Sequence, residues 1–156
     1  MSSAQSVKAP ESVDPRGPRF GAAITSVVLA LTLLLGPAGG LPLLIIQTLA
    51  FAAGSLLGLG YQPYGWIFRT VVRPRLQPPA ELEDSRPPRF AQTVGLVFAL
   101  AGLVGVVFGL PVLFYIAVGF ALVAALLNAI FDFCLGCEMY LLGKRLLNRP
   151  AAGGVA

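Results

Sequence analysis

Gly36-Pro37-Ala38-Gly39-Gly40-Leu41-Pro42 decides the fold, because this stretch interrupts a long block of sequence that carries no charge. The block runs from Phe20 to Phe68, about twice the ~20 residues that one membrane-spanning helix needs. Proline cannot continue a helix and glycine tolerates tight turns. The stretch therefore predicts a hairpin of two spans, residues 20–36 and 42–60.

A second uncharged block, Phe90 to Phe131, has the same form and is interrupted at Gly109-Leu110-Pro111. It predicts two further spans, residues 90–108 and 112–131. Residues 69–89, between the two blocks, are rich in proline and arginine and hold too little apolar surface to fold as a separate domain. We read them as a loop.

These blocks predict an all-α integral membrane protein with four transmembrane helices arranged as two tandem hairpins. A polar cytoplasmic tail, residues 1–19, would precede a single membrane domain, residues 20–147, and a flexible tail, residues 148–156, would follow it. Within the membrane domain we expect a first hairpin at 20–68, a cytoplasmic loop at 69–89 and a second hairpin at 90–147. A short amphipathic segment would follow each hairpin.

Matching landmarks suggest that the two hairpins are copies of one unit. Arg16-Gly17-Pro18-Arg19-Phe20 matches Arg86-Pro87-Pro88-Arg89-Phe90 at an offset of 70 positions, and Gly40-Leu41-Pro42 matches Gly109-Leu110-Pro111 at 69. Two spans per copy would give both copies the same orientation, as in parallel repeats. The alternative is that any two membrane hairpins begin with arginine and turn on proline.

The composition favours lipid as the solvent of this chain. Hydrophobic residues make up 56% of the 156 residues and charged residues only 12%, about half of what a soluble domain carries. The net charge of +4 lies beside the apolar blocks and forms no basic face, so we expect no nucleic-acid partner. There is no histidine, which removes the commonest general base and zinc ligand.

The basic residues predict the orientation. All 11 lysines and arginines lie in the N-terminal tail, the central loop or the C-terminal tail, and the two hairpin turns hold none. Because cytoplasmic segments carry an excess of Lys and Arg, both termini and the central loop should be cytoplasmic. The lipid bilayer is the first expected partner.

Small and polar residues inside the spans predict how the helices associate. A four-residue spacing of alanine (Ala117, Ala121, Ala125, Ala129) allows close packing, either within the monomer or in a homo-oligomer. Gln47 and Asn128 are the costliest polar side chains to bury in lipid, and we expect them to face other helices and form hydrogen bonds there.

Both cysteines lie in Phe131-Asp132-Phe133-Cys134-Leu135-Gly136-Cys137-Glu138, where the last apolar block meets the basic tail. Residues three apart share a helix face, so Cys134 and Cys137 can bridge, share a metal or pass a sulfur atom. Three interpretations stay open: inert cysteines, redox or sulfur-handling thiols, and a metal site. Two ligands are too few for a closed zinc site, so we expect no metal and no cofactor.

Two acids flank the cysteines. Asp132 would cap a new helix, placing Cys134 in its first turn, where the helix dipole stabilises a thiolate. Asp132 and Glu138 would oppose that effect through their negative charge, and would tune or accept protons. A permanent structural disulfide is not expected in the reducing cytoplasm.

The chain resembles the bacterial integral-membrane family catalogued as domain of unknown function 4395. The resemblance rests on Arg-Pro-Pro-Arg-Phe at 86–90 and Phe-Cys-Leu-Gly-Cys-Glu-Met-Tyr-Leu-Leu at 133–142, and it covers roughly residues 12–147. It implies a multi-pass bacterial plasma-membrane protein, and it suggests association with thioredoxin-like or sulfurtransferase proteins.

The expected function is a membrane-embedded thiol protein without an independent enzyme activity. Cys134 would attack and Cys137 would resolve, exchanging electrons or sulfane sulfur with a thioredoxin-like or rhodanese-like cytoplasmic protein. The alternatives are a non-catalytic membrane scaffold with silent cysteines and one half of a small-solute transporter. The absence of a charge deep in any span counts against a proton-coupled carrier.

Overall fold

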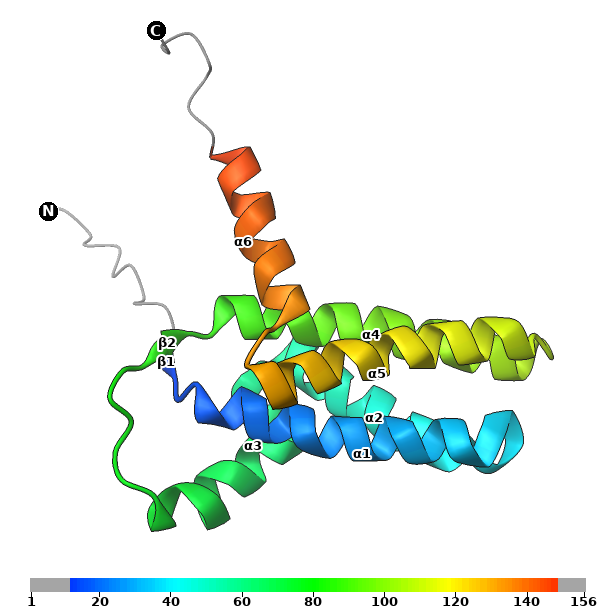
Figure 1. Cartoon of the computed structure of the whole chain (residues 1–156), viewed down its shortest axis with the longest axis horizontal. Coiled ribbons are helices and arrows are strands. Elements are labelled where there is room, and N and C mark those ends of the chain that lie inside the picture. Colours follow the sequence, from blue (N-terminus) through cyan, green and yellow to red (C-terminus); the bar gives the residue numbers. More distant parts are fainter. Residues whose placement is uncertain (1–11, 149–156) are drawn as a thin grey trace, which may run out of the picture.

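The computed structural model describes residues 12–148, and within this range the regular secondary structure is helical apart from one pair of two-residue strands (Figure 1). Three helices are long and apolar enough to cross a membrane, and a shorter apolar helix accompanies them. The long helices are α1 (Arg16–Gly39), α4 (Arg86–Val107) and α5 (Pro111–Phe131). The expected tails lie largely outside the described residues, at 1–11 and 149–156.

The other elements are shorter. Helix α2 (Leu41–Ala52) continues into the π-helix η1 (Ala53–Leu57), and a chain of small helical pieces follows it before the second hairpin. These pieces are η2 (Leu59–Tyr61), α3 (Pro63–Ile67), η3 (Phe68–Val72) and η4 (Arg73–Arg75). Helix α6 (Leu135–Leu147) closes the fold, and strands β1 (Ser12–Val13) and β2 (Glu83–Asp84) pair in antiparallel fashion.

Both predicted helix breaks are confirmed. Gly36 has φ 76°, a left-handed conformation that glycine adopts easily, and Pro37 follows it near the end of α1. Gly109 has φ 65° and Pro111 opens α5, where the missing N–H of proline costs nothing. The two turns lie at the same end of the bundle, opposite β1 and β2 (Figure 1).

The second predicted span is shorter than expected. It was predicted at 42–60, but the apolar helical run covers Leu41–Leu57, about 25 Å at 1.5 Å per residue. Gly58 ends it with φ 112° and ψ 164°, a conformation that a residue with a side chain adopts only under strain. The chain then turns into the small helices that flank the bundle.

The four main helices surround a compact core and leave most large side chains outside. Helix α1 packs on α2 and α5, and α4 packs on α2, α5 and α6. The core consists of Leu29, Leu44, Phe51, Ala99, Phe114, Val118 and Ala121. By contrast, Leu34 is 82% exposed and Phe120 61%. Apolar surface of this extent is stable against lipid tails, so the chain is a multi-pass membrane protein.

Gln47 confirms the expected interhelical hydrogen bonding. It is fully buried on α2, where its amide Nε2 donates to Thr25 Oγ1 of α1 at 3.3 Å and its Oε1 accepts from the Tyr64 hydroxyl of α3 at 2.9 Å. One side chain thus joins three helical segments. Asn128 lies half-buried on α5 and makes no side-chain hydrogen bond among residues 12–148.

Residues 12–19, which the sequence predicted as part of a polar tail, carry strand β1 and the start of α1. Ser12 and Val13 pair with Asp84 and Glu83 of the central loop. Asp14 is buried and forms an ion pair with Arg16 at 2.8 Å. The hydrogen bonds from the Arg16 guanidinium hold the pKa of Asp14 below its ordinary value.

Candidate thiol–disulfide site

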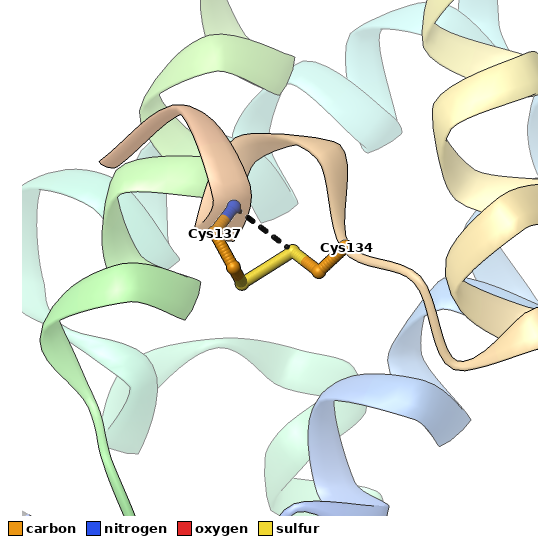
Figure 2. The surroundings of a disulfide bond; sticks show 2 residues. All are labelled: Cys134 and Cys137. Atoms are coloured by element: carbon orange, nitrogen blue, oxygen red, sulfur yellow. Dashed lines mark hydrogen bonds between the residues drawn. A yellow bond between two sulfur atoms is a disulfide. The ribbon is translucent and has the colours of Figure 1, made fainter. Parts of the chain in front are cut away.

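The site forms where α5 ends and α6 begins. The sulfur atoms of Cys134 and Cys137 are joined in a disulfide, with the two Cα atoms 5.1 Å apart (Figure 2). The two sulfurs lie close enough to bridge, as their spacing predicts, although Cys134 precedes the helix and does not share a helix face with Cys137. The argument from a reducing cytoplasm had disfavoured a permanent disulfide here, whereas the pair is bonded in this structure.

Cys134 is the N-cap of α6, one residue before the helix begins. Its backbone is extended (φ −88°, ψ 105°), and its Sγ accepts a hydrogen bond from the Cys137 backbone N–H at 3.3 Å (Figure 2). The free N–H groups and the dipole of a helix N-terminus stabilise negative charge. A thiolate released at Cys134 on reduction would receive this stabilisation, and the same geometry lowers the pKa of other N-terminal cysteines.

Asp132 does not cap α6, which corrects the expected role. It ends α5 in the left-handed conformation (φ 55°, ψ 29°), which Asp tolerates better than most residues. Glu138 lies in the first turn of α6, where an acid suits the helix dipole. Both side chains are exposed, and within the described chain neither forms a hydrogen bond to a cysteine. The structure therefore joins the two sulfur atoms, but it does not bring the carboxylates of Asp132 and Glu138 into hydrogen bonds with them.

Gly136, between the two cysteines, fixes α6 against α4. It is buried, and a Cβ added to it would lie 2.5 Å from Ala91 Cα and 2.6 Å from Ala91 Cβ. One helical turn further, the Tyr140 ring meets the Phe90 ring with centroids 5.8 Å apart. This contact between α4 and α6 positions the thiol pair. Ala91 was not predicted from the sequence, although a glycine between the cysteines is a visible sign of a close helix contact.

Arg19 holds the other end of the site. Its Nε donates to the Ala129 carbonyl at 3.1 Å and its Nη2 to the Ile130 carbonyl at 3.4 Å. The last carbonyls of a helix lack partners inside the helix, and a guanidinium there also complements the helix dipole. The first hairpin therefore anchors the end of α5, from which the thiol segment departs.

The surface around the disulfide is mainly apolar. Cys134 and Cys137 are half-buried, while Phe131 is 71% exposed, Met139 53% and Phe133 43%. A half-buried disulfide within an exposed apolar rim suits a protein that docks on it and attacks one sulfur. Among residues 12–148, no group of three or more His, Cys, Asp or Glu side chains gathers to hold a metal ion.

Comparison with known proteins gives one match. A family model described as "Domain of unknown function (DUF4395)" matches residues 13–145, a range that includes both cysteines and all four main helices. No curated protein and no solved structure matches the chain.

Proposed function

Because this chain belongs to the DUF4395 family, whose description assigns no activity, we propose a function from the geometry of α6: reversible thiol–disulfide exchange with a thioredoxin-like protein. The observation that carries the proposal is Cys134 at the N-cap of α6, bonded to Cys137 and accepting its backbone N–H. A pair of inert cysteines would require neither a disulfide between them nor a position at the N-terminus of a helix.

The exchange proceeds in two attacks. In the reduced chain, the Cys134 thiolate attacks a disulfide of the partner, forms a mixed disulfide and releases one partner thiolate. The Cys137 thiolate then attacks Cys134 Sγ, closes the Cys134–Cys137 disulfide and releases the second partner thiolate. Two electrons pass from the chain to the partner, and the two thiol protons accompany them. The reverse sequence reduces the chain.

Single-cysteine variants test the assignment of the two thiols. We expect Cys137→Ser to accumulate a mixed disulfide through Cys134 in intact cells, visible as a reductant-sensitive band on non-reducing gels. Cys134→Ser should give about five- to tenfold less adduct, because Cys137 lacks the N-cap position and the dipole stabilisation is worth up to ~2 kcal/mol. The double variant is the control. If neither single variant forms an adduct, the cysteines are silent and the scaffold interpretation replaces this one.

We infer that the membrane domain has four spans, with Leu41–Leu57 as the fourth. This run is somewhat short for a hydrocarbon core of ~30 Å, but Ile46 and Leu49 on its outer side are more than half exposed, as lipid-facing residues are. The pairing of β1 with β2 supports the inference. It brings the start of the chain and the central loop to one end of the bundle, which requires an even number of crossings between them.

From the basic residues we infer that this end, with the thiol pair, lies on the cytoplasmic side of a bacterial plasma membrane. Membrane-impermeant maleimide added to the same cells reports on which side of the membrane each thiol lies. In Cys137→Ser, the Cys134 thiol that is not held in the mixed disulfide should react only after lysis, and so should the single thiol of Ser12→Cys made in the cysteine-free background. Reaction of Cys134 in intact cells contradicts the orientation, and opposite behaviour of the two thiols contradicts four spans.

We also infer that the two hairpins are copies of one unit related by an approximate two-fold axis. Arg19 of the first copy binds the last carbonyls of α5, and Arg89 of the second binds those of Ser55 and Leu56 after α2, at 2.9 and 3.2 Å. Asp84 pairs with Arg86 as Asp14 does with Arg16. Phe20 meets Phe68 at 5.8 Å, as Phe90 meets Tyr140.

In this relation, Gln62 and Gly65 of α3 correspond to Cys134 and Cys137 of α6. Gln62 caps α3 through its Oε1, which accepts the Gly65 N–H at 2.6 Å, just as Cys134 Sγ accepts the N–H of Cys137. A side chain fits at Gly65, because a Cβ there comes no closer than 3.4 Å to another residue.

Copying the cysteine pair into the first hairpin tests the correspondence. We expect Gln62→Cys/Gly65→Cys, built on the Cys134→Ser/Cys137→Ser background, to form an intramolecular disulfide in most molecules under mild oxidation, as measured by mass spectrometry after alkylation. A matched pair two residues further on, Tyr64→Cys/Ile67→Cys, lacks the cap geometry and should oxidise less. Equal oxidation of both pairs, or none at the first, would argue against two equivalent copies.

A further inference from the structure

The first hairpin carries a hollow of about 330 Å³ beside α3, at the place that corresponds to the thiol site of the second hairpin. It is lined by β1 and the start of α1, by the helical pieces η2 to η4, by residues on either side of β2 and by one residue of α4. Its polar lining includes Asp14, Gln62, Arg69, Arg73, Ser85 and Gln92. Neither the thiol exchange nor the bundle packing described above uses this hollow.

The charge that this hollow offers to a ligand is positive. Arg69 and Arg73 lie one helical turn apart, and Arg69 Nη2 is held in place by the Gly60 carbonyl at 2.7 Å. Arg73 takes part in neither of the two ion pairs formed between residues 12 and 148. The one acid in the lining, Asp14, is already neutralised by two side-chain bonds from Arg16, at 2.8 and 3.0 Å.

A second hollow of about 380 Å³ shares the same two arginines. Its other walls come from the loop Leu76–Pro79, so Arg69 and Arg73 stand between two open spaces. Both arginines therefore line each hollow, so that an anionic group bound there meets two positive charges. Guanidinium forks fit the oxygens of a phosphate in pairs, which favours a phosphate ligand over a halide or a lone carboxylate.

The remaining lining suits a glycerol group joined to apolar chains. Gln62 and Ser85 are buried polar residues in the wall, and Gln92 Oε1 is buried without a hydrogen-bond donor in the described chain. Phe68, Leu59 and Leu82 supply apolar wall. Outside the hollow, Tyr61 and Trp66 are 70% and 59% exposed, as aromatic side chains at a membrane interface commonly are.

We propose that this hollow binds the headgroup of an anionic phospholipid, with its phosphodiester on Arg69 and Arg73. The glycerol hydroxyls of a phosphatidylglycerol headgroup would lie toward Gln62, Ser85 and Gln92, and the acyl chains would leave along the apolar outer side of α3. Basic residues at the membrane surface attract anionic lipid headgroups by their charge.

Titration of the purified full-length chain in detergent tests the proposal, with binding followed by native mass spectrometry. Short-chain phosphatidylglycerol should bind about five- to tenfold more tightly than phosphatidylcholine of the same chain length, and Arg73→Gln should remove that preference. The matched control is Arg75→Gln, two residues along, which removes the same charge but lines neither hollow. It should retain the preference within about twofold.

Three results would overturn the site. Equal affinity for the two lipids would show that the hollow does not select a phosphodiester with an anionic headgroup. If Arg73→Gln and Arg75→Gln reduced the preference for phosphatidylglycerol equally, the preference would be a general effect of surface charge. Inorganic phosphate that competes at the concentration of phosphatidylglycerol itself would identify a free-anion site instead. Unchanged thermal unfolding of both variants ensures that the comparison reports on binding.

Discussion

Replacing Gly105 with leucine is expected to lower the free energy of unfolding by about 3 kcal/mol, the upper end of the usual cost of overpacking a core. Gly105 of α4 lies against the first turn of α5. A Cβ added there would be 2.7 Å from the Phe114 backbone nitrogen and 3.0 Å from the Leu110 carbonyl oxygen. These are backbone atoms, which cannot rotate aside as a side chain can, so α4 and α5 must separate.

The separation would also disturb the core, because Phe114 is fully buried between the helices. A cost of about 3 kcal/mol is a large share of the ~5–15 kcal/mol by which most domains are stable. Thermal unfolding in detergent, followed by circular dichroism, measures the effect. The control is Gly119→Leu on α5, where a Cβ meets nothing within 4 Å. Both changes share the gain in helix propensity, so equal stability of the two variants would contradict the close contact.

Replacing Gly136 with leucine is expected to detach α6 from α4 while leaving the four-helix core folded. The added Cβ would overlap the Cα and Cβ of Ala91, at 2.5 and 2.6 Å, and the Phe90–Tyr140 contact would be lost with it. A local cost of about 2–3 kcal/mol raises the population of the opened α6 roughly 30- to 150-fold. Amide hydrogen exchange in α6 should accelerate by that factor, and reduction of the disulfide should become faster.

Two comparisons make this result specific. Gly143→Leu, on the same helix, adds its side chain to open space and should leave the exchange rate close to that of the unmodified chain. The milder Gly136→Ala should be rescued in part by Ala91→Gly, which removes the methyl group that it would meet. If Gly136→Leu and Gly143→Leu behave alike, α6 is not held by this contact, and the bundle does not position the thiol pair.

The sequence by itself determined which parts of the chain form long apolar helices. In lipid, a helix satisfies all of its own backbone hydrogen bonds, so an uncharged block predicts a helix whatever lies beside it. The turns at Gly36–Pro42 and Gly109–Pro111 followed from local chemistry in the same way, because proline and glycine act within a few residues. The position of the cysteine pair just beyond the last span was equally readable.

Only the tertiary structure decided how these helices meet. Nothing in the apolar pattern indicates that α1 packs on α5, or that Gly136 is the point at which α6 rests on Ala91. Nor does it show that Ser12 and Val13 pair with the central loop. The same holds for the early end, at Gly58, of the helical run formed by α2 and η1. It holds as well for the N-cap role of Cys134, which the sequence had led us to assign to Asp132. Such contacts join residues far apart in the chain and depend on the shapes of the surfaces that meet, which a one-dimensional pattern of polarity does not contain.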